Sequence, residues 1–539
     1  MCDICIFFGD RDFEHDVFEL VRAFYPGKKL RSIYEKPEEN CGDLLFLEVS
    51  KEENSYVFRY RTPDREGDRR AALKGQFSEK DEDALISCPA GTDSLLSAKG
   101  CQEYRVKDRR TPESHRLRKQ NKDALKSVLY QLLRELTGKD LPWGNLTGIR
   151  PAKLAMGLLD EGMTKEQVIA SMEEQYFVSR KKTALAVSIA CREKEILKEI
   201  DYASGYSLYI GIPFCPSICL YCSFSSCPIG LWKNRVEDYL EALFLEIRET
   251  AKIMADDGRR LQTVYIGGGT PTTLSPSQLY RLLFEITESF PFGDVLEFTV
   301  EAGRPDSITK DKLLAIKAHP VTRISVNPQT MNQKTLDIIG RRHTVLQTEE
   351  AFNLARETGF DNINMDLIVG LPGEGLMEVQ ETLGRIRALS LDSLTIHSLA
   401  LKRASRLNTD WERYRELSFE NSQEIMDAAM ETAAQLDMSP YYLYRQKNMK
   451  GNFENVGCAK DSKAGIYNIL IMEEKQPIIA LGAGGSSKLV MRGADRIERV
   501  ENVKDVAAYI SRIQEMIERK RQGITMFLRE KQTYGKGSY

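Results

Sequence analysis

The sequence predicts an α/β protein built around an incomplete (β/α)6 barrel. Short apolar segments alternate with amphipathic helical patterns between residues 207 and 399, and this alternation is typical of parallel strands joined by right-handed crossovers. Barrel enzymes carry their active sites at the carboxyl ends of the strands, so functional residues are expected there. The predicted strands are Ser207–Ile212, Thr263–Ile266, Glu297–Glu301, Arg323–Val326, Asn362–Ile368 and Ser393–Leu399, with helices such as Val236–Ala255 and Pro276–Glu288 between them.

Three further regions accompany the barrel, which is expected over residues 205–400. Residues 1–106 are predicted to form a small α/β domain. Residues 107–204 are predicted to form a linker and a helical domain, since seven Lys or Arg and only two acids lie between Lys107 and Lys122. Residues 401–539 are predicted to form an α+β region that covers the substrate. Elements expected outside the barrel are helices at Phe13–Phe24 and Phe419–Leu436 and strands at Leu44–Ser50, Tyr56–Tyr60 and Tyr467–Met472.

Composition excludes several classes of protein. The 539 residues carry 76 basic and 79 acidic side chains, and this balance argues against a dedicated nucleic-acid surface. No apolar run approaches the ~18 residues of a membrane-spanning helix, and no basic segment precedes the short apolar N-terminal patch, so a signal peptide is not expected. Eleven cysteines in such a chain favour reduced thiols. We therefore expect a cytoplasmic protein in which Cys2 and Cys5 are either bystanders or a redox pair.

Three cysteines are grouped directly after the first predicted barrel strand. Cys215, Cys219 and Cys222 have C-x3-C-x2-C spacing, and three thiolates on one loop can bind one metal centre. Zinc would need a fourth ligand, which only Cys227 could supply locally. A four-iron cluster normally takes four cysteines, so three would leave one iron with an open position.

This triplet, with an aromatic residue before its last cysteine, resembles the signature of radical S-adenosylmethionine (SAM) enzymes. The resemblance implies a [4Fe–4S] cluster whose open iron binds the amino and carboxylate groups of SAM. The reduced cluster would cleave SAM to methionine and a 5′-deoxyadenosyl radical that abstracts hydrogen. A glycine strip at the end of the second strand, Gly267-Gly268-Gly269-Thr270, supports the resemblance, because glycine lets a ligand approach the backbone closely and the family uses this strip for the methionine amino group.

Other motifs extend the resemblance over nearly the whole chain, to the oxygen-independent coproporphyrinogen III oxidase family and most closely to its HemZ-type coproporphyrinogen dehydrogenases. The motifs are Pro142–Pro151, Leu367–Gly373, Lys402–Ser405, Tyr441–Met449 and Ala480–Lys488.

The family's SAM contacts carry over to the ends of the predicted strands. The resemblance implies that Tyr209 packs near the sulfonium, that Glu301 pairs with the methionine ammonium and that Arg341 clamps the carboxylate, with Tyr209 and Arg341 as the catalytic candidates. A charge-assisted bond to an ammonium contributes ~1.5–3 kcal/mol. The implied cofactor-binding set is Tyr209, Tyr221, Gly268, Gly269, Thr270, Glu301, Gln329, Arg341, Asp366, Ala400 and Ser486, and the implied metal ligands are Cys215, Cys219 and Cys222.

The sequence departs from the best-known branch of this family at four points. Phe224 stands where that branch has a fourth cysteine, Gly211 where it has a histidine, and Ser486 where an isoleucine contacts cofactor. That branch's N-terminal segment has no visible counterpart. These changes leave the cluster chemistry intact and concern the second cofactor position and the substrate step.

The resemblance implies oxidative decarboxylation of two propionates of coproporphyrinogen III to vinyl groups, giving protoporphyrinogen IX. The expected partners are the porphyrinogen and a flavodoxin- or ferredoxin-like electron donor, with no nucleic acid and no membrane span. Two alternatives stay open, a haem chaperone or carrier and a radical SAM haem methyltransferase, although the chaperone's haem-binding histidine is Tyr467 here. Candidate groups for the substrate carboxylates are Lys402, Arg403, Arg445, Lys447 and Lys488, and His343 and His397 are either substrate contacts or structural.

Overall fold

The computed structural model describes residues 2–37, 44–73, 112–147, 150–202, 204–402, 404–414, 416–417, 419–446, 449–491 and 496–534. The chain divides into two compact units, one of residues 1–147 and 170–180 and the other of residues 148–169 and 181–539. Of the candidate substrate-binding residues, Arg403 and Lys447 lie outside the described part. No helix in the described part is long and apolar enough to cross a membrane.

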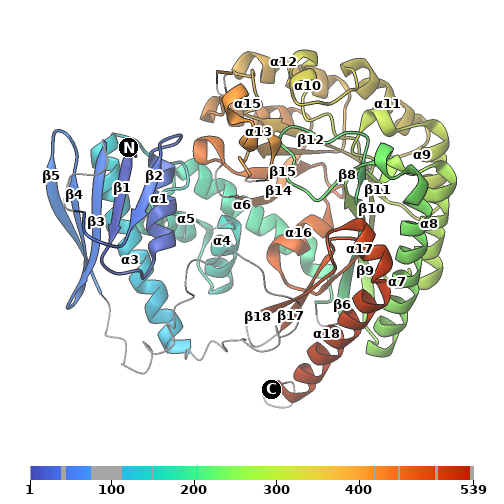
Figure 1. The fold of residues 1–539 in the computed structure, drawn as a ribbon, viewed down its shortest axis with the longest axis horizontal. Helices are drawn as coiled ribbons and strands as arrows, with labels where there is room; N and C mark the ends of the chain where they lie inside the picture. Colours follow the sequence, from blue (N-terminus) through green and yellow to red (C-terminus); the bar gives the residue numbers. More distant parts are fainter. Residues whose placement is uncertain are drawn as a thin grey trace. The chain divides into compact units, whose positions relative to one another are not determined.

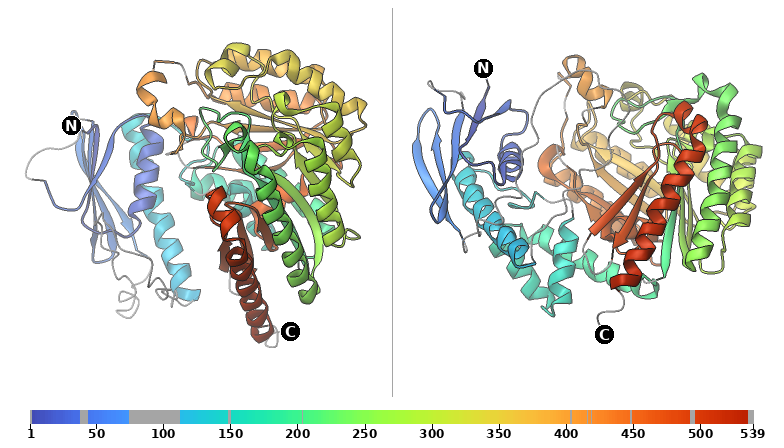
Figure 2. Two further views of the ribbon diagram at one scale, coloured as in Figure 1. Left: turned by 45° about the vertical axis from the view of Figure 1, so that its right-hand side comes forward. Right: turned by 60° about the horizontal axis from the view of Figure 1, so that its bottom comes forward.

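The first unit is a five-stranded sheet with strand order β2-β1-β3-β4-β5. Helices α1 and α3 pack beside the sheet (Figures 1 and 2), and their apolar faces bury Leu20, Phe24, Leu129 and Tyr130. The elements are β1 (Ile4–Phe8), α1 (Glu14–Phe24), β2 (Leu30–Ile33), β3 (Leu45–Glu52), β4 (Ser55–Arg61), β5 (Glu66–Ala72) and α3 (Pro112–Thr137). The first unit thus combines a sheet with helices, and the chain is helical from Pro112 to Thr137.

The second unit is built on one eleven-stranded sheet, in the order β14-β15-β13-β12-β11-β10-β9-β6-β16-β17-β18. All six predicted barrel strands are present and pair in parallel, which confirms the incomplete α/β barrel. They are β6 (Gly205–Ile212), β9 (Arg260–Gly268), β10 (Glu297–Glu301), β11 (Arg323–Ser325), β12 (Ile363–Val369) and β13 (Ser393–Ser398).

Strands from the C-terminal region extend both ends of this barrel sheet. Strand β15 pairs antiparallel with β13, and β16 pairs in parallel with β6, so strands from the C-terminal region continue the sheet. The sequences of these strands show no clear alternation of apolar and polar residues. Their bounds are β14 (Ser439–Tyr444), β15 (Asn455–Ala459), β16 (Ile478–Leu481), β17 (Ser486–Met491) and β18 (Arg496–Glu501).

Helices cover the outer face of the barrel strands (Figure 1). A capping box, in which the Ser275 hydroxyl accepts from the Gln278 amide and the Gln278 side chain accepts in return, fixes the start of α8. From residue 150 onward, the described α-helices of both units are α4 (Pro151–Asp160), α5 (Lys165–Tyr176), α6 (Arg180–Ile196), α7 (Val236–Asp257), α8 (Pro276–Ser289), α9 (Lys310–Lys317), α10 (Gln333–Ile338), α11 (Val345–Glu357), α12 (Leu376–Ala388), α13 (Arg406–Thr409), α14 (Trp411–Tyr414), α15 (Gln423–Gln435), α16 (Ile466–Glu473), α17 (Val506–Ser511) and α18 (Ile513–Tyr534).

One predicted element has the wrong type. The segment Tyr467–Met472 was expected to be a strand and belongs to helix α16. A short apolar run is compatible with a buried strand or a buried helix. Here the carboxylate of Glu297, on β10, accepts hydrogen bonds from the backbone amides of Ile466 and Tyr467. This distant acceptor satisfies the first free amides of the helix.

Candidate active site

The cysteine loop leaves the end of β6 and is tied to its neighbours on several sides. The short strand β7 (Phe214–Cys215) pairs with β8 (Cys227–Pro228). The amide of Leu220 donates to the Ile339 carbonyl (2.9 Å), and the Leu220 carbonyl accepts from the Leu407 amide (2.9 Å). These bonds fix the path of the loop that carries all three cysteines.

The three thiols of the triplet lie within electrostatic reach of one another. Cys219 is buried, and Cys215 and Cys222 are half-buried. Burial raises the pKa of the Cys215 and Cys222 thiols, and the charges of the other triplet cysteines raise the pKa of Cys215 further. No group of three Cys, His, Asp or Glu side chains within the described ranges adopts the geometry of a single-metal site. Three thiols on one anchored loop fit a cluster, which is larger than one ion.

The glycine strip at the end of β9 lies directly against the cysteine loop. The amide of Gly269 donates to the Ile212 carbonyl and the amide of Thr270 to the Phe214 carbonyl, both at 2.7 Å. A Cβ at Gly269 would lie 2.6 Å from the Phe214 carbonyl oxygen, so this glycine permits the close approach of two backbones. Gly268, with φ of +107°, is the exposed residue of the strip. Thr270 also donates its hydroxyl to the Cys215 sulfur at 3.6 Å.

Glu301 lies at the end of β10 in an aromatic setting. The hydroxyl of Tyr265 donates to its carboxylate. The Tyr265 ring stacks against Tyr467 with centroids 4.6 Å apart and against Tyr209 with centroids 6.2 Å apart. Burial raises the pKa of Glu301 to about 7, the charge of Asp366 adds to the rise, and the Tyr265 hydrogen bond opposes it.

Sequence reasoning missed Tyr265 and Tyr467. Tyr265 follows the ordinary alternation of a strand, and Tyr467 belongs to the misassigned helix α16. One signal for Tyr265 was present in the glycine strip. A Cβ at Gly267 would lie 2.8 Å from the Tyr265 ring and 3.2 Å from the Glu301 carboxyl carbon, so the first glycine of the strip makes room for this pair.

Asp366, at the end of β12, is held by neighbouring polar groups. Its carboxylate accepts from the Asn364 amide group at 2.7 Å and lies 3.7 Å from the His397 ring nitrogen Nε2. Burial would raise the pKa of Asp366, but the contacts with His397 and Asn364 hold that pKa below its ordinary value. The amide of Gln329, a residue with φ of +69°, donates to the Asp366 carbonyl at 3.0 Å. The contacts of His397 are thus those of a residue that orients Asp366.

Arg341 is buried beside the cysteine loop. One of its guanidinium nitrogens donates to the Asn327 carbonyl. Burial would lower the pKa of Arg341, but its interactions with Tyr221 and Cys219 raise the pKa above the ordinary value. Its Nε has no hydrogen-bond partner among the described residues. This N–H group can therefore donate a hydrogen bond to a bound ligand.

Two predicted residues lie at strand ends with other neighbours. Ala400 follows β13, is half-buried and forms a bridge with Met449. Ser486 begins β17, and its hydroxyl donates to Glu501 of β18 at 3.5 Å. Their roles in cofactor binding remain predictions.

Comparison with known proteins places this site in a family. The radical SAM superfamily model matches residues 209–386. The oxygen-independent coproporphyrinogen-III oxidase-like protein HemZ of Bacillus subtilis is 40% identical over 404 residues, which cover 75% of this chain and 81% of HemZ. The chain belongs to this radical SAM family of HemZ-like proteins. Its cofactors are accordingly a [4Fe–4S] cluster and SAM.

Two further relatives match less of the chain. The haem chaperone HemW of Bacillus subtilis is 39% identical over 198 residues, 36% of this chain and 51% of HemW. The chain thus spans about half the length of that relative. Among solved structures, coproporphyrinogen III oxidase HemN from Escherichia coli, a radical SAM enzyme, matches with 24% identity and a TM-score of 0.46, covering 60% of this chain and 72% of HemN.

The HemZ-like chain offers fewer free cations near its motifs than the sequence suggested. Arg445 is buried and donates to the carbonyl and side chain of Asn452. Lys488 lies 3.6 Å from the Glu474 carboxylate. Lys402 is half-buried, burial lowers its pKa, and no carboxylate of the described chain forms an ion pair with it. Of the three described candidates, Lys402 is therefore the one that remains for a substrate carboxylate.

His343 is buried in this structure. Its side chain is fully buried, 3.9 Å from Asp306, and burial lowers its pKa to about 3. A part for this histidine in substrate binding remains a prediction.

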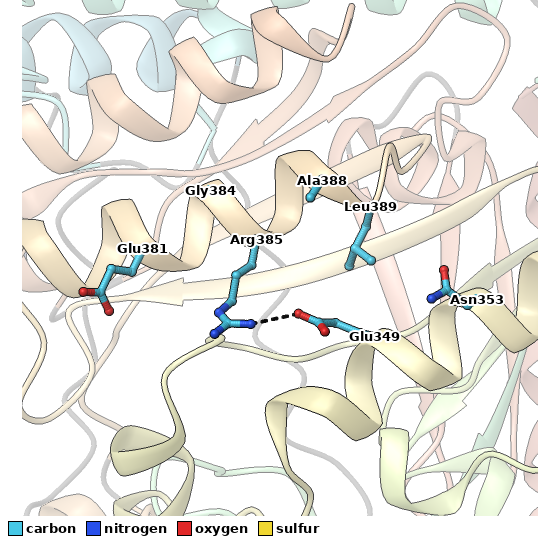
Figure 3. A pocket seen from close by; sticks show the side chains of 7 residues that line it. All are labelled: Glu349, Asn353, Glu381, Gly384, Arg385, Ala388 and Leu389. Atoms are coloured by element: carbon cyan, nitrogen blue, oxygen red, sulfur yellow. Dashed lines mark hydrogen bonds and ion pairs between the residues drawn. The ribbon is translucent and has the colours of Figure 1, made fainter.

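A groove of about 770 Å³ lies elsewhere, between α11 and α12 (Figure 3). It is lined by Glu349, Asn353, Glu381, Gly384, Arg385, Ala388 and Leu389. An ion pair between Arg385 and Glu349 (3.1 Å) spans it, and none of its residues was predicted to bind cofactor or substrate.

Proposed function

We propose that this protein converts coproporphyrinogen III to protoporphyrinogen IX without oxygen. The similarity to HemZ over three quarters of the chain carries the proposal. The cofactors, when bound, supply a 5′-deoxyadenosyl radical that takes a hydrogen atom from the β-carbon of a propionate. The propionate then loses carbon dioxide, and one electron passes to a one-electron acceptor, which leaves a vinyl group. Two propionates react in this way.

The residues of the site have distinct tasks in this proposal. Cys215, Cys219 and Cys222 hold the cluster, and Glu301 and Arg341 bind the ammonium and carboxylate of SAM. The carboxylate at the end of β10 and the guanidinium in the loop after α10 have opposite charges, which suit the two charges of an amino acid. Tyr265 orients Glu301 through its hydroxyl, and Tyr209 supplies an apolar surface for the sulfonium region.

The remaining SAM contacts and the substrate cation complete the proposal. Asp366 binds ribose hydroxyls, with His397 and Asn364 fixing its carboxylate. Tyr221, Gln329, Ala400 and the glycine strip contact the rest of SAM, and Ser486 lies near the second cofactor position. Lys402 receives a carboxylate of the macrocycle, which is tetra-anionic with an apolar body, so that a cation beside apolar walls suits it.

The test is an anaerobic assay of protein reconstituted with iron and sulfide. Reductant, SAM and coproporphyrinogen III are added, and products are followed by mass spectrometry. Deoxyadenosine together with a porphyrinogen that has lost two carboxyl groups is expected. Deoxyadenosine without the lighter porphyrinogen would reject the substrate and direct the assay to haem. Stoichiometric haem binding without turnover would instead favour a carrier, as the similarity to HemW allows.

A further inference from the structure

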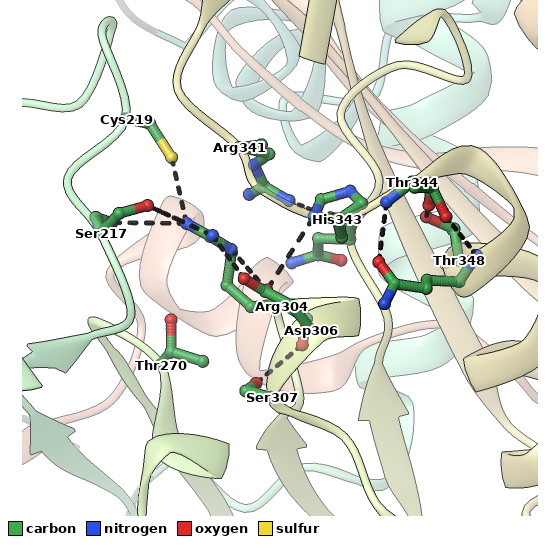
Figure 4. A network of polar contacts seen from close by, with 12 residues as sticks. Ser217, Cys219, Thr270, Arg304, Asp306, Ser307, Arg341, His343, Thr344 and Thr348 are labelled. Carbon is green, nitrogen blue, oxygen red and sulfur yellow. Dashed lines mark hydrogen bonds and ion pairs between the residues drawn. The ribbon is translucent and has the colours of Figure 1, made fainter. Parts of the chain in front are cut away.

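Arg304 contacts the cysteine loop with a fully engaged guanidinium group. It follows β10 and is 2% exposed. Its Nη1 donates to the Cys219 sulfur at 3.7 Å and to the Ser217 hydroxyl at 3.2 Å. Its Nε and Nη2 donate to the two carboxylate oxygens of Asp306 at 2.9 and 2.8 Å. Figure 4 shows the side chain between the loop and Asp306.

The surroundings keep this guanidinium charged and in one orientation. Arginine carries its charge at any accessible pH, and its planar fork matches a carboxylate. Burial would raise the pKa of Asp306, but the bonds from Arg304 hold that pKa below its ordinary value, so the partner is ionised. His343, packed behind the pair, has a pKa lowered by burial and is neutral. The side chain of Asp306 is 19% exposed, so water screens the carboxylate more than the 3%-exposed arginine.

The cysteines of the triplet differ in the donors that reach them. The Cys215 sulfur accepts a hydrogen bond from the neutral hydroxyl of Thr270, whereas the Cys219 sulfur accepts one from the charged guanidinium of Arg304. Hydrogen bonds to the sulfurs and local charge set the reduction potential of an iron–sulfur cluster. A cationic donor stabilises the reduced form, which carries one more negative charge, and therefore raises the potential.

We propose that Arg304 is a positioning residue that fixes the Cys219 ligand and raises the reduction potential of the cluster, with Asp306 as the counter-charge that moderates this effect. The inference rests on the cluster of the family and not on the porphyrinogen substrate. The two side chains that act on the cluster, Arg304 and Asp306, have charges of opposite sign. Removing the cation lowers the potential, and removing the carboxylate raises it.

The experiment is a redox titration of reconstituted protein without SAM or substrate. The reduced cluster is followed by electron paramagnetic resonance in Arg304→Gln, Arg304→Lys and Asp306→Asn, each checked for iron and sulfide content. We expect Arg304→Gln to lower the ratio of reduced to oxidised cluster at a fixed potential about tenfold, equivalent to about 59 mV for a one-electron couple. Arg304→Lys should lie between it and the wild type, and Asp306→Asn should shift the opposite way.

A matched control is Arg356→Gln. Arg356 forms an ion pair of the same kind with Asp392 (2.6 Å) at the amino ends of the strands, and its loss should leave the potential unchanged. An unchanged potential in a fully loaded Arg304→Gln variant would overturn the proposal. If that variant fails to bind a cluster, Asp306→Asn decides, because a lowered or unchanged potential there contradicts the electrostatic role. The decarboxylation assay plays no part in either result.

Discussion

The binding of SAM should depend on pH through Glu301, and the structure sets the size of the effect. The carboxyl group has a pKa of about 7, and an ammonium pairs with its ionised form. Binding should therefore strengthen as pH rises through this value. About a tenth of the group is ionised at pH 6 and about half at pH 7, so affinity should rise about fivefold, or ~1 kcal/mol. This range lies below the ~7.7–8.0 at which an α-amino group itself titrates.

The assay is isothermal titration of SAM into protein that carries an oxidised cluster, at pH 6.0, 6.5 and 7.0. Tyr265→Phe removes the hydrogen bond that lowers the pKa of Glu301, so its profile should move to higher pH and its affinity at pH 7 should fall. Glu301→Gln should bind weakly with no pH dependence in this range. Tyr280→Phe, which changes an exposed tyrosine on α8, is the control. A wild-type affinity that is constant from pH 6 to pH 7, or a Glu301→Gln profile with the wild-type slope, would refute the reasoning.

Three other predictions concern the cluster and the fold. Cys219→Ala should abolish both SAM cleavage and the ~400 nm absorbance of the cluster, measured after reconstitution. Gly269→Ala should reduce iron loading, because its Cβ would lie 2.6 Å from a backbone oxygen of the cysteine loop, measured by iron analysis. Lys520→Met should destabilise the second unit by about 3–5 kcal/mol, measured by thermal or denaturant unfolding, because it leaves the fully buried carboxylate of Glu246 without its cation at 3.0 Å.

Each of these predictions has a contrasting result. Retention of the absorbance by Cys219→Ala would remove this residue from the ligand set. Gly293→Ala, where a Cβ meets nothing within 4 Å, should load iron normally, and equal loading by the Gly269 variant would show that the two backbones can separate. The double variant Lys520→Met with Glu246→Gln should recover part of the stability lost in Lys520→Met, since no buried charge is then left alone and the amide oxygen still accepts from Tyr509, and a double variant no more stable than Lys520→Met would contradict this account.

The barrel was predictable because its strands are buried on both faces and separated by amphipathic helices. Strands β6, β9 and β10 give short apolar runs that end at the cysteine loop, the glycine strip and Glu301. The C-terminal strands were not predictable in this way. Strand β15, for example, is Asn-Val-Gly-Cys-Ala, a sequence without a clear period that is completely buried only because it pairs between β13 and β14.

The sequence alone indicated the cofactor chemistry through its resemblance to radical SAM enzymes, because the spacing of Cys215, Cys219 and Cys222 and the glycine strip, which carry that resemblance, are local patterns on single loops. It also determined which residues end the barrel strands, since strand order in a parallel barrel follows the chain. Only the tertiary structure decided the neighbours of these residues. Tyr265 beside Glu301, and Arg304 beside Cys219, come from separate strands or loops. Such contacts depend on how side chains pack at the sheet edge, and no sequence period encodes that packing.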